Sequence, residues 1–105
     1  MVNKMHLTNA EIERLVLIIE EAGEVVQAAT KVLRHGYECY SPFDEKKRTN
    51  RFLLECELAD LLGVIDFAVE NKDIDIAVIN DYKEHKMANA YEYLHYQKKL
   101  INENN

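Results

Sequence analysis

The sequence predicts an all-α domain built from three main helices. Glycine (3) and proline (1) are scarce among the 105 residues, which favours long helices joined by few turns. Apolar side chains recur every three or four residues over two long runs, which is helical spacing. The composition, 48% apolar and 30% charged, is typical of a globular protein, and the length fits a single domain spanning residues 1–105.

The first helix is predicted over residues 9–35. Thr8 and Glu11 form a capping-box pattern at its start, and Gly36 suits its end. Its apolar side chains form a broad stripe with two parts. The main part is Ile12, Leu15, Val16, Ile19, Ala22, Val26, Ala29 and Leu33, and the flanking part is Ile18, Val25 and Val32.

Residues 37–49 form the one long connection. It contains a Ser-Pro turn signal and a charged run, so we expect a flexible, solvated loop. The alternative is a lid whose aromatic rings, Tyr37, Tyr40 and Phe43, stack on a base, because long loops in compact domains are often functional.

Two further helices complete the predicted fold. The second spans residues 50–71 and is capped by Thr49 or Asn50. Its apolar stripe comprises Leu53, Leu54, Leu61, Val64, Ile65, Phe67 and Ala68. The third spans residues 75–100, is capped by Asp73 or Asp75, and is followed by a frayed tail at residues 101–105.

Charge and hydropathy exclude several classes of function. The net charge of −6 argues against a nucleic-acid duplex as partner, because such binding depends on clustered Lys and Arg. No run of about 18 apolar residues is present, so no membrane span is expected, and no apolar signal core follows the N-terminus. A cytoplasmic location follows, and Cys39 and Cys56 are expected to be reduced thiols.

Two groups of carboxylates carry the chemistry. Glu20, Glu21 and Glu24 lie in the first predicted helix, where Glu21 and Glu24 share a side with apolar residues and Glu20 leans toward water. Glu57 and Asp60 interrupt the apolar stripe of the second helix, where an unpaired carboxylate is costly. If the two helices pack face to face, four carboxylates meet, a pair from each helix, and a cation between them would relieve their repulsion. The alternative is a solvated bundle whose carboxylates are matched by Lys and Arg.

The type of ligand narrows the choice of metal. All of these groups are hard oxygen donors, which suit Mg²⁺, with Mn²⁺ as a second possibility, better than zinc. A di-iron bundle needs two Glu-x-x-His motifs, and only Glu92 and His95 have that spacing.

The two acidic motifs resemble the EExxE…ExxD signature of the MazG-like all-α nucleoside triphosphate pyrophosphohydrolases, in their small phage and bacterial form. The resemblance extends over about residues 11–97 and includes the segments 24–36 and 57–66, with Cys56 at a position where many members carry a glutamate. It implies a four-helix-bundle arrangement completed by oligomerisation, as a homodimer or homotetramer.

The resemblance also implies an activity: Mg²⁺-dependent conversion of a (d)NTP to the (d)NMP and pyrophosphate, of the nucleotide-pool house-cleaning kind. By motif position, Glu21, Glu24, Glu57 and Asp60 would bind the metal, and Glu20 would contact a second ion or orient water. Candidates for holding the substrate phosphates are Lys31, Arg34, Lys83 and Lys86. Two alternatives stay open: a non-catalytic helical oligomerisation or regulatory module with a degenerate metal site, and a metal-dependent relative acting on a phosphoribosyl nucleotide.

Overall fold

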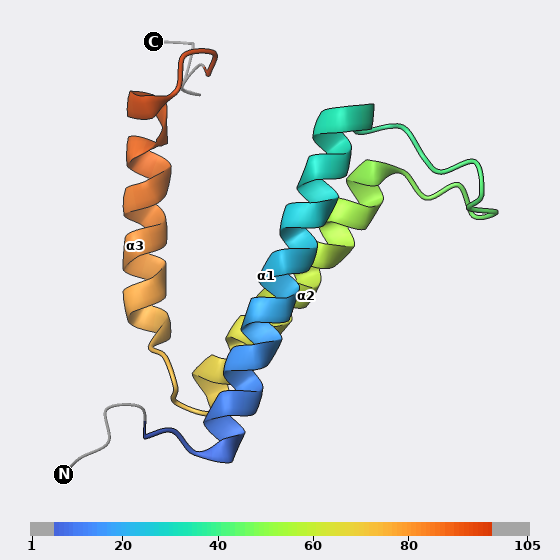
Figure 1. The fold of residues 1–105 in the computed structure, drawn as a ribbon. Coiled ribbons are helices and arrows are strands. Elements are labelled where there is room, and N and C mark those ends of the chain that lie inside the picture. The colour runs from blue at the N-terminus through green and yellow to red at the C-terminus, as the bar shows by residue number, and fades with distance from the viewer. Residues whose placement is uncertain (1–5, 98–105) are drawn as a thin grey trace. The chain divides into compact units, whose positions relative to one another are not determined.

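The computed structural model describes residues 6–97, and within that range it contains helices and no strands. The chain divides into two compact units, Met1–Ile74 and Asp75–Asn105. The first unit is a helical hairpin, in which α1 (Asn9–His35) and α2 (Asn50–Glu70) lie side by side and run in opposite directions (Figure 1). The second unit contains α3 (Ile76–Asn89) and a 3₁₀ turn, η1 (Ala90–Tyr93). The all-α prediction is confirmed for the described residues, none of whose helices is long and apolar enough to cross a membrane.

The predicted ends of the first two helices agree with the structure because local capping determines them. Thr8 Oγ1 accepts the backbone N–H of Glu11 at 3.1 Å, and Glu11 Oε1 accepts the backbone N–H of Thr8 at 2.7 Å. Gly36 ends α1 with a φ of +87°, a conformation that favours glycine. Thr49 caps α2 through the N–H of Phe52, and Asn71 lies one position beyond the last helical residue.

The third helix is shorter than the predicted span of residues 75–100. Asp75 is its N-cap, accepting the N–H of Ala77, and the α-helix ends at Asn89. After the 3₁₀ turn, Leu94 has extended backbone angles. Asparagine and aromatic residues, which are poorer helix formers than Ala or Leu, are frequent from Asn89 onward. The predicted tail at residues 101–105 lies outside the described residues.

The seam between α1 and α2 follows alternating steps of four and three residues on both helices, the spacing of a coiled coil. Every seam position is buried or half-buried. From α1 these positions are Arg14, Ile18, Glu21, Val25, Ala28 and Val32, and from α2 they are Asn50, Leu54, Glu57, Leu61, Val64 and Ala68. Glu21 and Glu57 therefore occupy positions that otherwise hold mostly apolar side chains.

The apolar stripe of α1 is arranged differently from the expectation. The flanking side chains Ile18, Val25 and Val32 face the seam, whereas most of the predicted main part remains exposed. Ile19, Val26 and Leu33 have exposed fractions of 69%, 65% and 87%. Both sets have helical spacing, so the periodicity alone does not decide which set packs against α2.

Candidate metal centre

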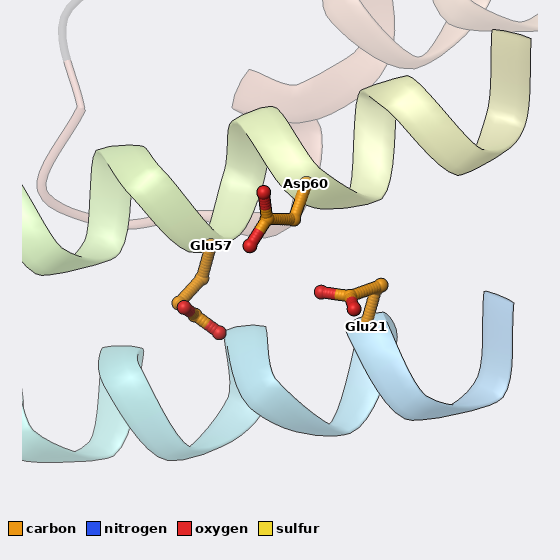
Figure 2. A group of neighbouring side chains, drawn as sticks. All are labelled: Glu21, Glu57 and Asp60. Atoms are coloured by element: carbon orange, nitrogen blue, oxygen red, sulfur yellow. The ribbon is translucent and has the colours of Figure 1, made fainter. Parts of the chain in front are cut away.

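Three of the five predicted site carboxylates converge halfway along the seam. One oxygen from each of Glu21, Glu57 and Asp60 lies within 4.8 Å of the others. Figure 2 shows Glu21 on α1 and both Glu57 and Asp60 on α2, with their carboxylates directed into the space between the helices. Glu57 and Asp60 are three residues apart, so α2 presents both on the side facing α1.

The burial of these groups differs from one to the next. Glu21 and Glu57 are half-buried because they lie on the seam, whereas Asp60 is exposed at its edge. Glu24 was expected in partly buried surroundings, but it is exposed and lies outside the converging group. It lines a cavity of about 170 Å³ together with Glu57, one turn further along the hairpin. Glu20 is exposed, as its position on the helix predicted.

The electrostatic effect of this convergence falls on Glu21. Loss of hydration at the seam raises the pKa of the Glu21 carboxyl above its ordinary value. Neighbouring negative charges raise this pKa further, in decreasing order those of Asp60, Glu57, Glu24 and Glu20. Glu20 and Glu24, which lie outside the converging group, thus still contribute to the negative potential at Glu21.

Cations of the protein do not neutralise the group within the described residues. The ion pairs there join Arg14 to Asp73, Arg48 to Asp44, Arg51 to Glu38 and, when the imidazole is protonated, His85 to Asp81. None of them involves Glu21, Glu57 or Asp60. The alternative of carboxylates matched by Lys and Arg is therefore not what this part of the chain forms at its centre.

The donor set fits a hard divalent cation. Three carboxylates supply only oxygen ligands, which Mg²⁺ and Mn²⁺ prefer. Oxygens around Mg²⁺ lie about 3.0 Å apart when adjacent and about 4.2 Å apart when opposite, since each Mg–O distance is about 2.1 Å. Three oxygens that already lie within 4.8 Å of one another would have to draw closer around such an ion. Exposed acidic groups are also common without an ion, so the assignment of these residues as ligands stays a prediction.

The predicted phosphate-binding residues fall on two different units. Lys31 and Arg34 lie near the end of α1, are exposed, and line a cavity beside the connection to α2. Lys83 and Lys86 lie on α3 in the second unit, where both are exposed.

Two residues beside the site were missed by sequence reasoning. Asn50 was interpreted as a possible helix cap, yet Thr49 takes that role and Asn50 is 8% exposed on the seam. Arg48 was assigned to a solvated charged run, yet it lines the same cavity as Lys31 and Arg34. A signal for Asn50 was available, because it continues the four-and-three spacing of the second apolar stripe toward its N-terminus.

Comparison of the chain with family models, curated proteins and solved structures finds no match. The assignment to the MazG-like enzymes therefore stays a prediction from the two acidic motifs and the segments around them.

Proposed function

We propose that this chain is a MazG-like, Mg²⁺-dependent nucleoside triphosphate pyrophosphohydrolase, which converts a (d)NTP to the (d)NMP and pyrophosphate. One observation carries the proposal: Glu21, Glu57 and Asp60 bring oxygens within 4.8 Å of one another on a helical seam, without a protein cation paired to them in the described residues. Such an arrangement costs free energy unless a cation is bound there.

The proposed reaction follows from the charges of the two partners. The triphosphate and the carboxylates are both anionic, so they would repel each other directly. A bound divalent cation would screen this repulsion and polarise the α-phosphorus. The oxygen of a water molecule attacks the α-phosphorus and the water gives up a proton to solvent. The bond between the α-phosphorus and the bridging oxygen breaks, its electron pair stays on that oxygen, and pyrophosphate leaves.

The residues of the chain have distinct roles in this proposal. Glu21, Glu57 and Asp60 hold the cation, with Glu24 approaching from the neighbouring turn of α1. Glu20, exposed and next to Glu21, orients the attacking water or contacts a second ion. Lys31 and Arg34 lie on the same hairpin and hold substrate phosphates. Lys83 and Lys86 belong to the second unit and are proposed for the same task because of their positive charge.

Assembly into a homodimer or homotetramer is part of the proposal. Of the hairpin's side chains, Ala28, Asn50 and Ala68 are buried, while Ile19, Val26 and Leu33 are among those exposed on the outer side of α1. Exposed apolar stripes of this kind mark protein–protein contacts. A second copy of the chain would supply the further helices of a four-helix arrangement, and the molar mass in solution tests this.

The activity is tested by incubating the full chain with canonical and modified dNTPs, NTPs and phosphoribosyl-ATP, with Mg²⁺, and measuring pyrophosphate release. We expect release from at least one triphosphate and its loss on chelation. Glu57→Gln should lower kcat by about a hundredfold or more, because it replaces a negatively charged metal ligand with a neutral amide of the same shape. Glu55→Gln is the matched control, since Glu55 is exposed on the same helix and lies outside the converging group.

Three outcomes separate the alternatives. Full activity in Glu57→Gln contradicts the assignment of the site. Release from phosphoribosyl-ATP alone favours the phosphoribosyl-nucleotide relative. Folding and assembly without any turnover, unchanged by Glu21→Ala or Asp60→Ala, favours the non-catalytic helical module.

A further inference from the structure

A basic cavity lies where α1 joins α2, next to the carboxylates. Its volume is about 350 Å³, within the usual range for small-molecule sites. Lys31, Arg34 and His35 line it from the end of α1, and Arg48 lines it from the connection. Lys31, Arg34 and Arg48 give three permanent positive charges, against a single carboxylate, Asp44. In a chain whose net charge is −6, this is a locally positive site.

Backbone contacts fix the shape of the cavity wall. The N–H of Asn50 donates to the carbonyl of Cys39 at 2.8 Å, and its side-chain Nδ2 donates to the carbonyl of Gly36 at 3.1 Å. The N–H of Arg51 donates to the carbonyl of Tyr37 at 2.8 Å. The beginning of the connection is thereby tied to the beginning of α2. The cavity is consequently built from backbone that these hydrogen bonds hold in place.

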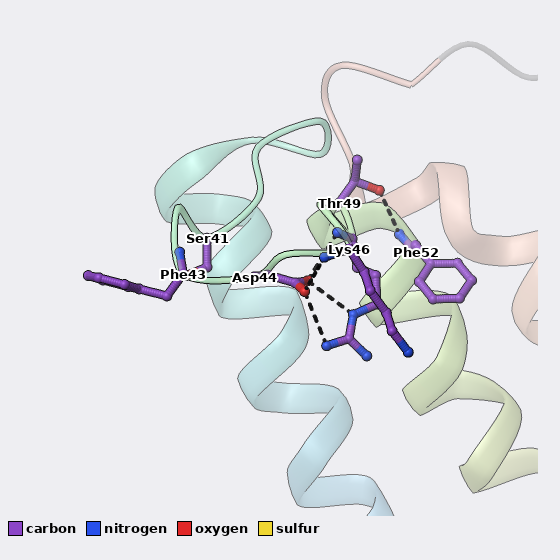
Figure 3. Close-up of polar contacts among 7 residues, drawn as sticks. Ser41, Phe43, Asp44, Lys46, Thr49 and Phe52 are labelled. Carbon is purple, nitrogen blue, oxygen red and sulfur yellow. Dashed lines mark hydrogen bonds and ion pairs between the residues drawn. The ribbon is translucent and has the colours of Figure 1, made fainter.

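The single carboxylate of the lining is already satisfied within its own turn. Asp44 accepts the backbone N–H groups of Lys46 and Arg48, each at 3.0 Å, and from the Arg48 side chain it accepts Nε–H at 3.0 Å and Nη2–H at 3.4 Å (Figure 3). The hydrogen bond from the Arg48 side chain is the largest cause that lowers the pKa of Asp44. A guanidinium has five N–H donors, and Asp44 takes two of those of Arg48, so the other three stay available for an anion. Asp44 therefore positions Arg48 and does not use up its capacity to bind.

The basic cavity shares part of its wall with a second cavity on the carboxylate seam. A second cavity, of about 170 Å³, is lined by Glu24 and Glu57. Lys31, Asn50 and Leu53 line both cavities. An anion in the basic cavity would thus be separated from Glu24 and Glu57 by this shared wall.

The aromatic side chains of the connection do not favour a base in this cavity. Tyr37 has its ring covered by the guanidinium of Arg51, which lies 4.3 Å from the ring centroid. Phe43 is 92% exposed, and Figure 3 shows its ring directed away from the helices. Of the three rings, Tyr40 lines the cavity, where its hydroxyl is a possible donor to a phosphate oxygen.

We propose that this cavity binds the β- and γ-phosphates of the substrate, which leave together as pyrophosphate, and that Arg34 and Arg48 are their principal contacts. This inference rests on the proposed function, since it assigns a binding site to the two phosphates of the substrate beyond the α-phosphorus. Lys31 lies on the wall between the two cavities and so bridges the leaving group and the carboxylates. The cations stabilise the charge that develops on the leaving group, a contribution that the carboxylates themselves cannot make.

The test is binding of inorganic pyrophosphate to the full chain by calorimetry, at constant ionic strength, with chelator and separately with Mg²⁺. We expect binding under both conditions. Arg34→Gln and Arg48→Gln should each weaken it about tenfold, the usual effect of losing a charge-assisted hydrogen bond. Arg48→Lys should recover part of the loss. The matched control is Lys46→Gln, which removes one positive charge from the same connection at a position outside the cavity lining.

Arg34 keeps this test independent of the fold of the connection, because it lies on α1 and outside the Asp44 turn. Equal weakening in Lys46→Gln and Arg34→Gln would mean that only the overall charge matters and would overturn the proposal. Binding that requires Mg²⁺ and ignores both arginines would place pyrophosphate at the carboxylates and would also overturn it.

Hydrolysis assays separate a failure of this inference from a failure of the proposed function. If triphosphates are cleaved but the arginine variants keep the KM and the product inhibition by pyrophosphate, the cavity assignment is wrong and the activity stands. If no triphosphate is cleaved but pyrophosphate binding still depends on Arg34 and Arg48, the cavity is an anion site and the proposed activity is wrong.

Discussion

Two carboxylates on the α1–α2 hairpin have opposite electrostatic surroundings. Near the start of α1, Arg14 donates from Nη2 to Asp73 at 3.0 Å and from Nε as well, and this hydrogen bonding is the main cause that lowers the pKa of Asp73. Halfway along, Glu21 meets Glu57 and Asp60, and its pKa is raised. Both carboxylates are half-buried, so burial alone does not explain the contrast. The difference lies in whether the chain supplies a cation, and at the centre the described residues supply none.

The largest effect expected from this contrast is stabilisation by Mg²⁺. A ligand at one hundred times its Kd stabilises the folded state by about 2.7 kcal/mol, which corresponds to a rise in Tm of about 10 °C for a chain of this size. We expect such a rise on adding Mg²⁺ and its reversal on chelation, measured by circular dichroism. Glu21→Gln should lose the response, whereas Asp73→Asn should keep it. A chain that gains nothing from Mg²⁺ or Mn²⁺ would contradict the metal centre.

A smaller effect is expected from removing the cation at the other place. Arg14→Gln leaves Asp73 half-buried without its guanidinium, so the Tm at pH 7 should fall by several degrees. Since the folded state lowers the pKa of Asp73, the stabilisation is complete above the ordinary value of about 3.9 and is lost as the pH falls through the lowered pKa. The difference in Tm between wild type and variant should therefore shrink below about pH 4.

Glu38→Gln is the control for this second comparison, because it breaks the ion pair with Arg51 and keeps the Arg51 guanidinium over the ring of Tyr37. The Arg51–Glu38 pair is exposed on both sides, with side-chain exposures of 52% and 72%. Exposed pairs contribute little to stability, so the Tm should hardly change. An equal fall in Tm in both variants would mean that the position of the Arg14–Asp73 pair on the seam does not strengthen it.

Local signals were sufficient to predict the helices but not which face of each helix packs against its neighbour. The capping box at Thr8 sets the start of α1, and the glycine at position 36 sets its end. Both signals lie next to the helix ends in the sequence, so the bounds of α1 could be predicted locally. Two apolar faces on α1 have the same periodicity, and only the packing of α2 shows that Ile18 and Val25 lie inside. The end of α3 at Asn89 was missed because an apolar pattern continues beyond the point where helix propensity declines.

The candidate site was predictable to the extent that helical spacing determines it. Glu57 stands out because it interrupts an apolar stripe, and the structure places it on the seam. Contacts between distant residues have no such signal. Arg14 and Asp73 are 59 positions apart, and nothing in their local sequence pairs them. The basic cavity likewise depends on Asn50 reaching back to Gly36, a contact that helix periodicity does not reveal.

The smallest expected effect concerns the central carboxylates when no metal is bound. Glu21→Gln should raise the Tm of the chelated protein by a few degrees, because it removes a charge that lost hydration and like neighbours both disfavour. The folded state raises the pKa of Glu21, so its ionised form destabilises the fold, and the gain should be full above that raised pKa. The gain should vanish below the ordinary value of about 4.3, where the wild-type group is protonated as well. Glu20→Gln, at an exposed position, should change the Tm less. A fall in Tm for Glu21→Gln would mean that the cluster stabilises the hairpin by itself, and the central reason for placing a cation there would be gone.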